Sequence, residues 1–314
     1  MFDPEALYIW EPNGLEAAQK AAAESGDGLV LLYQFDGFID AGLAGTSVVR
    51  HLLEEGDPRV VARFDTDQLI DYRTRRPQMI FRRDRWASVD APELAVHLVN
   101  DATGTPFLVL SGPEPDGRWE AFSAAVRDLV DRLGVRLTVY VHGMPMSVPH
   151  TRPVGHTPHG TRRDLAAPVP AWFEKAPVPG SAAALLELRL GEAGYDVLGL
   201  GAHVPHYVTD SPYPAAAVVL LEAVQAATGL VLPSAGPRSL IDDVRAEIDA
   251  QLAEADELAE SVRAMERQYD LAMVAMADTM AADDRVTGAD LPTADELGRL
   301  FEDFLAEQDR GANG

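Results

Sequence analysis

Histidine is concentrated in one stretch of the chain. Six of the eight histidines lie between positions 142 and 206, and the segments HTPH and HVPH each place two imidazoles three residues apart. Imidazole nitrogen is a common zinc ligand, so His156, His159, His203 and His206 are the candidate metal ligands, with Asp210 four residues beyond the second pair. Each pair encloses a proline, which excludes a regular helix. Loop histidines without metal are therefore the favoured interpretation, and no cofactor is expected.

A glycine-rich segment, QFDGFIDAGLAGTS at residues 34–47, joins an apolar run to a helical pattern. At the carboxyl end of a strand, backbone N–H groups at the start of a helix can bind an anion. The dinucleotide fingerprint and the phosphate loop are both absent, and two aspartates in the segment oppose an anion. A tight turn with close helix–sheet packing is the favoured alternative. The candidate ligand-pocket residues are Asp36, Gly37, Asp40, Gly42, His150 and Arg152.

Arginine is concentrated between positions 73 and 85, where six occur in thirteen residues among several aspartates. Two interpretations stay open. The segment is either a solvated charged loop or an ordered interface, because bidentate arginine–carboxylate pairs are common at interfaces. RNA binding would also use arginine, but the strongly acidic remainder of the chain opposes it. The candidate interface residues are Arg73, Arg75, Arg76, Arg82, Arg83 and Trp86.

No complete catalytic signature is present. There is no G-x-S-x-G elbow, and Ser111, at the end of an apolar run, has no marked partner base. The chain has no cysteine, which excludes disulfides, thiolate metal ligands and a cysteine nucleophile. A cysteine-free composition suits a cytoplasmic protein. An enzyme is therefore the less favoured interpretation.

The overall charge restricts the classes of partner. The formal net charge is −24 and 47% of the residues are hydrophobic. Such a negative field repels nucleic acid, so no nucleic-acid partner is expected. No apolar run approaches the roughly 20 residues that span a bilayer, and the acidic start MFDPEALYIWEPNG does not match a secretory signal. No membrane partner is expected.

Apolar runs and amphipathic segments alternate over the first three quarters of the chain. This alternation predicts an α/β domain over residues 1–235, with a mostly parallel sheet covered on both faces. Residues 65–90 are predicted to form an irregular charged loop. Residues 144–179 show little periodicity, and so long a connection favours a functional or interfacial segment. The predicted strands are 28–35, 60–64, 94–99, 107–112, 136–143 and 195–208, and the predicted helices are 41–55, 120–134, 180–194 and 214–229.

The remaining residues, 236–314, are predicted to form an acidic helical extension. Residues 241–314 carry 20 acidic and 6 basic side chains, and apolar residues recur every three or four positions from Ile241 to Met276. This seam fits a long helix packed on its own domain, an antiparallel helical hairpin or an inter-subunit coiled coil. Thr293 and Glu296 form a capping box that predicts a final helix.

Several of these segments, taken together, resemble the family of the second subunit of the proteasome assembly chaperone, in its larger actinobacterial-like branch. The resemblance spans most of residues 7–230, and the acidic helical extension resembles that of the same branch. The segments that carry it are YQFDGFIDAGLAG (33–45), DTDQLIDYRTRRP (65–77), TPFLVLSGPEPDGRWEAF (105–122), VHGMPMSVPHTRPVG (141–155), PGSAAALLELRLGEAGYD (179–196) and HVPHYVTDSPYPAAA (203–217).

The resemblance implies a fold similar to that of nucleoside phosphorylases, with a mixed or parallel sheet, flanking helices and no established enzyme activity. It implies a chaperone or scaffold protein that binds proteasome α subunits. Some relatives dock through a C-terminal hydrophobic–Tyr–any tripeptide, and the sequence RGANG at 310–314 does not match it. The alternative expectation is a phosphorylase- or hydrolase-like enzyme that acts on a small anionic or nucleoside-type substrate through residues 36–47 and the histidine-rich region.

The resemblance also implies self-association, because phosphorylase-like folds commonly form trimers. We expect a homotrimer whose contacts involve the arginine-rich segment and residues 144–179. Exposed Arg–Asp pairs contribute little to stability, so apolar anchors are needed in such an interface. The expected anchors are Met79, Phe81, Trp86 and Trp172. The alternative is a monomer with a solvated charged loop.

Overall fold

The computed structural model of the chain describes residues 4–166, 175 and 177–286. It divides into two compact units, residues 1–266 and residues 267–314. In the second unit the described residues, 267–286, are helical. The candidate anchor Trp172 and the capping box at Thr293 and Glu296 lie outside the described residues.

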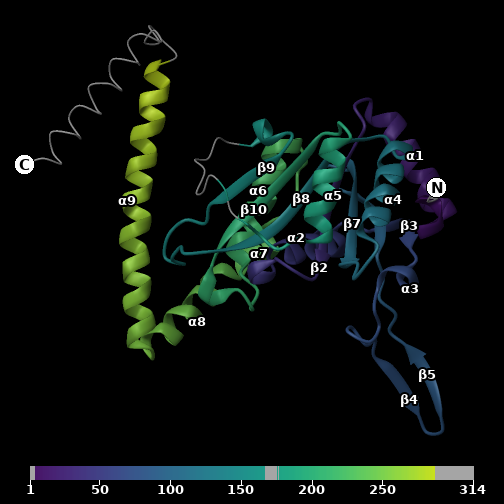
Figure 1. Cartoon of the computed structure of the whole chain (residues 1–314), viewed down its shortest axis with the longest axis horizontal. Helices are drawn as coiled ribbons and strands as arrows, with labels where there is room; N and C mark the ends of the chain where they lie inside the picture. Colours follow the sequence, from purple (N-terminus) through teal and green to yellow (C-terminus); the bar gives the residue numbers. More distant parts are fainter. Residues whose placement is uncertain (1–3, 167–174, 176, 287–314) are drawn as a thin grey trace, which may run out of the picture. The chain divides into compact units, whose positions relative to one another are not determined.

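The first unit is built on one eight-stranded sheet with the order β1-β3-β6-β7-β2-β8-β10-β9 (Figure 1). The central strands β7, β2, β8 and β10 are parallel, whereas the pairs at both edges are antiparallel. The predicted mixed sheet is confirmed, but the sheet is parallel only at its centre. The strands are β1 (Tyr8–Trp10), β2 (Leu29–Asp36), β3 (Arg59–Phe64), β6 (Ala95–Asn100), β7 (Pro106–Pro113), β8 (Val135–Met146), β9 (His156–Gly160) and β10 (Val197–Pro205).

Helices cover both faces of this sheet, as the alternating pattern predicts. One core lies between the sheet and helices α1, α4 and α5, and the other lies between the sheet and helices α2, α6 and α8. The sequence analysis did not predict β1 or α1. The helices are α1 (Pro12–Ser25), α2 (Ala44–Glu55), α3 (Thr66–Leu69), α4 (Trp119–Arg132), α5 (Ala182–Glu192), α6 (Pro214–Thr228), α7 (Ala235–Ser239), α8 (Ile241–Ala253) and α9 (Asp256–Val286).

The apolar seam after residue 240 forms two helices rather than one. α8 ends at Ala253 and α9 begins at Asp256. Ile248 and Leu252 of α8, with Val262 and Met265 of α9, are buried in the same core as α2 and α6. Burying such a side chain contributes about 2 kcal/mol, so this part of the extension packs on its own domain. The boundary at residue 235 stays a prediction.

Two segments predicted to be irregular contain strands. β4 (Met79–Arg82) and β5 (Arg85–Val89) form a separate antiparallel hairpin that extends from the sheet (Figure 1). Arg83, in the two-residue turn, has a left-handed φ of 61°. The prediction of an irregular loop was wrong here because the charged residues obscure the short β-forming runs. Similarly, the HTPH segment, predicted to be a loop, forms the edge strand β9.

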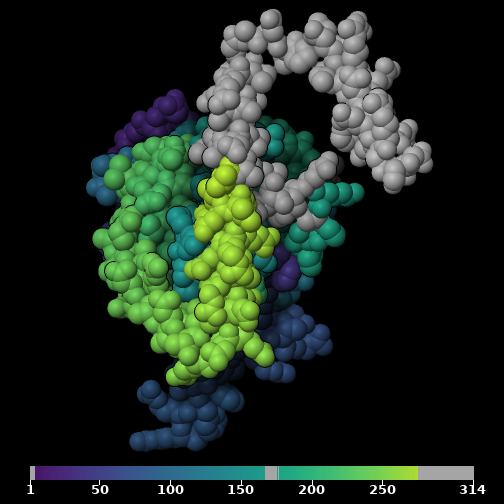
Figure 2. Space-filling model, turned by 90° about the vertical axis from the view of Figure 1, so that its left-hand side faces the viewer, coloured from purple at the N-terminus to yellow at the C-terminus, as the bar shows by residue number. Residues whose placement is uncertain are grey.

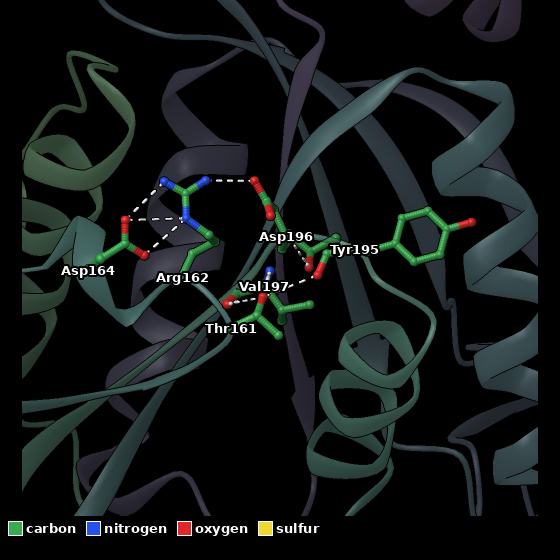
Figure 3. Close-up of polar contacts among 7 residues, drawn as sticks. Thr161, Arg162, Asp164, Tyr195, Asp196 and Val197 are labelled. Atoms are coloured by element: carbon green, nitrogen blue, oxygen red, sulfur yellow. Dashed lines mark hydrogen bonds and ion pairs between the residues drawn. The ribbon is translucent and has the colours of Figure 1, made fainter.

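The end of β9 is fixed to the start of β10 by a polar cluster (Figure 3). Arg162 forms ion pairs with Asp164, at 3.0 Å, and with Asp196, at 2.6 Å. The Thr161 hydroxyl accepts a hydrogen bond from the Val197 backbone N–H, at 2.9 Å. These contacts hold the histidine-rich edge strand in register on the sheet.

Candidate functional site

The turn between β2 and α2 lies at the carboxyl edge of the sheet and contains four of the six candidate ligand-pocket residues. Within it, the Asp40 carboxylate accepts hydrogen bonds from the backbone N–H groups of Gly45, Thr46 and Gly143, each at 2.8 Å. The first two belong to the start of α2, and the third belongs to β8. The chain's own carboxylate therefore occupies the position that an anion would take at this helix N-terminus.

Two glycines allow the turn to approach its neighbours closely. A Cβ atom at Gly45 would lie 2.3 Å from the backbone oxygen of Val141, and one at Gly42 would lie 2.7 Å from the Cβ of Tyr213. Gly42 also has a positive φ of 64°, which favours glycine. The glycines thus serve close packing, which is the alternative that the sequence analysis favoured. Asp36 is exposed and accepts a hydrogen bond from the Thr46 hydroxyl at 3.2 Å.

His150 and Arg152 lie in a different place, beside α8. The His150 side chain is 1% exposed, and its Nδ1 lies 2.8 Å from the Tyr207 hydroxyl while its Nε2 lies 3.0 Å from Oδ1 of Asp249. Burial raises the pKa of Tyr207. A Tyr–His–Asp chain of this kind can relay a proton, but it also connects the loop at residue 150 to α8.

A second set of contacts fixes the same loop to Glu266 in the third turn of α9. The Thr151 hydroxyl donates to Oε1 of Glu266 at 2.5 Å, and Arg152 pairs with the same oxygen at 3.4 Å. Beside these contacts is a cavity of about 400 Å³ that His150 and Arg152 line. Asp36, Gly37, Asp40 and Gly42 are not among its lining residues. The structure therefore separates the six candidate pocket residues into two groups.

Three other histidines contact one another or nearby polar side chains. His142 Nε2 lies 3.2 Å from His159 Nε2, and His159 Nδ1 lies 2.8 Å from Oε1 of Glu187 on α5. Desolvation, followed by the proximity of His159, lowers the pKa of His142 to about 3. His203 lies 2.8 Å from the Thr157 hydroxyl, and burial lowers its pKa to about 4. Both imidazoles are neutral at pH 7.

The candidate metal ligands do not converge. His156 and His159 lie on β9, and His203 lies on β10. His206 follows β10 and contacts the Tyr207 ring edge-on, with 5.5 Å between ring centroids. Within the described residues, no group of three histidine, aspartate or glutamate side chains is placed to hold a metal ion. Nor does any described helix have the length and apolar character needed to cross a bilayer.

Comparison with known proteins assigns the family. The PAC2 family profile matches residues 34–255, which include the end of β2, the Asp40 turn, the hairpin and α8. The chain belongs to the PAC2 family. No curated protein sequence matches it. The resemblance to proteasome assembly chaperones that the sequence analysis identified is confirmed.

Solved structures of three other proteins match most of this PAC2-family chain. A Mycobacterium tuberculosis protein of unknown function is 42% identical, with a TM-score of 0.80, over 88% of this chain and 92% of its own. A Corynebacterium glutamicum protein of unknown function is 39% identical, with a TM-score of 0.79, over 85% and 97%. A M. tuberculosis proteasome-assembly chaperone homologue is 26% identical, with a TM-score of 0.68, over 74% and 100%.

In this PAC2-family protein the arginine-rich segment divides into two parts. Arg75 faces inward, donating to the backbone oxygen of Glu114 at 2.9 Å and pairing with Asp116 at 3.0 Å. Arg73 pairs with Asp71 at 3.3 Å on the surface. The hairpin residues Arg82, Arg83 and Trp86 are exposed, as is Arg76 before the hairpin. Sequence spacing located the segment but did not separate the inward arginine from the exposed ones.

Residues of the cavity that the sequence analysis missed lie far apart in the chain. Besides the loop at 150–154, its lining includes Tyr213 and Pro214 at the start of α6 and Arg245 on α8. Proline at the first position of a helix, with no preceding Ser, Thr, Asp or Asn, is a sequence signal for a helix N-terminus without a side-chain cap. That signal was available at Tyr213 and Pro214.

Proposed function

We propose that this PAC2-family protein is a non-enzymatic protein-interaction factor of the proteasome-assembly-chaperone type. The observation that carries the proposal is the Asp40 carboxylate, which takes three backbone N–H groups and closes the helix N-terminus where an enzyme of this architecture would bind an anionic substrate. The 26% identity to a proteasome-assembly chaperone homologue supports the choice of partner, proteasome subunits. The cysteine-free chain suits the cytoplasmic location that this function requires.

The β4–β5 hairpin is the surface that we assign to this interaction. Met79 and Phe81 of β4 pair with Val89 and Trp86 of β5, so these four side chains share one face. They are 49%, 55%, 51% and 62% exposed, and the Phe81 and Trp86 rings meet edge-on with 5.1 Å between centroids. An isolated two-stranded hairpin is at best marginally stable in water, so a partner surface is expected to cover this face.

The same surface also suits self-association. We propose a homo-oligomer, as a trimer, in which the apolar hairpin face and residues 144–179 contribute contacts. Arg82, Arg83 and Arg85 beside the apolar face complement the strongly acidic remainder of the chain. A stable interface of this kind would bury roughly 1,200 Å² or more in total.

Two measurements on the full chain test these proposals. A pull-down from a proteasome-bearing source is expected to recover proteasome subunits, and light scattering at low micromolar concentration is expected to give the mass of a trimer. The double substitution Phe81→Ala with Trp86→Ala is expected to lower both the recovery of proteasome subunits and the mass. Ile80→Ala with Ser88→Ala, on the opposite face of the hairpin, is the matched control and is expected to change neither. Recovery of no proteasome subunit contradicts the partner, and a monomer mass contradicts the assembly.

A second candidate function rests on the Tyr207–His150–Asp249 chain beside the cavity. A buried histidine held between a hydroxyl and a carboxylate is an arrangement that acid–base catalysis uses. The alternative is therefore a hydrolase or phosphorylase that acts on a small anionic or nucleoside-type substrate. Turnover of a nucleoside with inorganic phosphate that is abolished by His150→Phe would favour this alternative, and its absence would favour the interaction factor.

A further inference from the structure

No hairpin residue lines the cavity beside α8, so this cavity is separate from the proposed interaction surface. Its walls come from three segments: the loop at residues 150–154, the start of α6 and the inner side of α8. Figure 2 looks onto the face of the molecule where the green segment with α6 to α8 lies. The volume of the cavity, about 400 Å³, is within the range of small-molecule sites.

Three features of the cavity favour a negative charge. α6 is 15 residues long and begins at Pro214 with no side-chain cap, so its positive N-terminal end is open. Tyr213 is 6% exposed, and its hydroxyl makes no hydrogen bond to any residue that the structure describes. Arg245 lines the cavity and forms no ion pair with any other described residue. Pro214 of α6, Tyr213 and Arg245 all line the cavity.

Two acidic side chains of the surrounding helices, Asp249 and Glu266, already have other partners. Asp249 accepts from His150 at 3.0 Å, and Glu266 accepts from Thr151 at 2.5 Å and pairs with Arg152 at 3.4 Å. Arg152 is therefore not counted as a free cation. One guanidinium, that of Arg245, remains available. A ligand with a single negative charge matches this balance better than a phosphate ester with two.

The rest of the lining is apolar. Ile241, Val244 and Ile248 of α8 line the cavity together with Pro153 and Val154 of the loop. We propose that the cavity binds a small molecule that has an apolar body and one carboxylate. Arg245 and the Tyr213 hydroxyl hold the carboxylate beside the first turn of α6, and the aliphatic side chains of α8 contact the apolar body. This site goes beyond the protein-interaction function and does not depend on it.

Octanoate is the probe that tests this inference, because it combines one carboxylate with a short aliphatic chain. Calorimetric titration of the full chain is expected to show saturable binding of octanoate, with at least tenfold weaker binding of 1-octanol and of octylamine. Equal binding of octanoate and octanol would overturn the carboxylate recognition. No octanoate binding at millimolar concentration would overturn the site.

Matched variants locate the binding. Arg245→Gln is expected to weaken octanoate binding at least tenfold, and Tyr213→Phe is expected to weaken it severalfold while preserving the ring. Arg238→Gln is the control, because Arg238 lies on the adjacent α7, pairs with Glu222 and does not line the cavity. An affinity that falls equally in the Arg245 and Arg238 variants would show a general charge effect and refute the assignment.

Discussion

The N-termini of α2 and α6 lie close together, yet only the first has a side chain that accepts hydrogen bonds from its backbone N–H groups. At α2, the Asp40 carboxylate takes two N–H groups of the first turn and a third from β8. At α6, no side chain caps the helix, and a cavity adjoins its first turn. Gly42 connects the two places, since its backbone oxygen accepts the Tyr213 N–H at 2.8 Å.

This difference shows why a glycine-rich turn is a weak guide to a ligand site. The turn at α2 has the glycine-rich composition of an anion site, but the Asp40 carboxylate of the chain itself fills that site. The start of α6 has no motif, and its arginine comes from a helix about 30 residues later in the chain. Only the packing of α8 against the loop at 150–154 brings those groups to one cavity.

Asp40→Ala is expected to have the largest effect on stability. It leaves three backbone N–H groups without their charged acceptor, and we expect the free energy of unfolding to fall by about 3 kcal/mol. Urea denaturation followed by circular dichroism measures this change. Asp36→Ala is the matched control in the same turn, because its exposed carboxylate accepts one hydroxyl bond at 3.2 Å.

The same variant gives a sharper test of the closed helix end. If Asp40 occupies an anion site, its removal opens that site, and added sulfate is expected to restore part of the lost stability. Wild-type protein is expected to respond less to the same sulfate concentration. Two results would contradict the interpretation that Asp40 closes the N-terminus of α2. One is a loss of under 1 kcal/mol in the free energy of unfolding of Asp40→Ala. The other is a variant that sulfate stabilises no more than it stabilises wild type.

The core of the fold follows from local sequence patterns, whereas the site does not. Apolar runs such as residues 28–35 and 107–112 predict β2 and β7, because a strand buried on both faces needs continuous apolar residues. The hairpin at 79–89 was missed, since arginine and aspartate interrupt its alternation. The pairing of His150 with Asp249 joins residues about 100 positions apart, which spacing alone does not predict.

A fall in pH is expected to lower the free energy of unfolding through His142, which lies on β8 beside the Asp40 turn. His142, next to Gly143 on β8, has its pKa lowered to about 3 by burial, so in the fold it stays neutral while the unfolded chain takes up a proton near pH 6.5. Its contribution is thus present above pH 6.5 and is lost as pH falls toward 3. At pH 5 the loss is about 2 kcal/mol.

His142→Phe isolates this effect, because a phenyl ring can keep the stacking on Tyr140, whose ring centroid lies 4.5 Å away. The difference in unfolding free energy between pH 7 and pH 5 is expected to be about 2 kcal/mol smaller in the variant than in wild type. His51→Phe is the control, since His51 contacts the backbone oxygen of Pro233 on the other face of the sheet. An unchanged pH difference would show that His142 is not held neutral.

Asp249→Ala tests the contact that joins α8 to His150 beside the cavity. The change leaves Nε2 of the buried His150 without its acceptor, so we expect a loss of about 1 kcal/mol in the free energy of unfolding. Glu247→Ala, an exposed position two residues earlier on α8, is expected to have no measurable effect. Hydrogen exchange of α8 amides should also rise in the Asp249 variant alone. Equal effects of the two substitutions would refute the role of this contact.

Arg245→Gln is expected to have the smallest effect on stability, and this is what distinguishes a binding residue from a structural one. Because the Arg245 guanidinium pairs with no carboxylate among the described residues, its loss removes no charged contact of the fold. The free energy of unfolding should stay within about 0.5 kcal/mol of wild type. With the same octanoate concentration, however, the midpoint of unfolding should rise clearly less in the variant than in wild type. A variant that is destabilised without octanoate would show that Arg245 supports the packing of α8, as Asp40 supports α2.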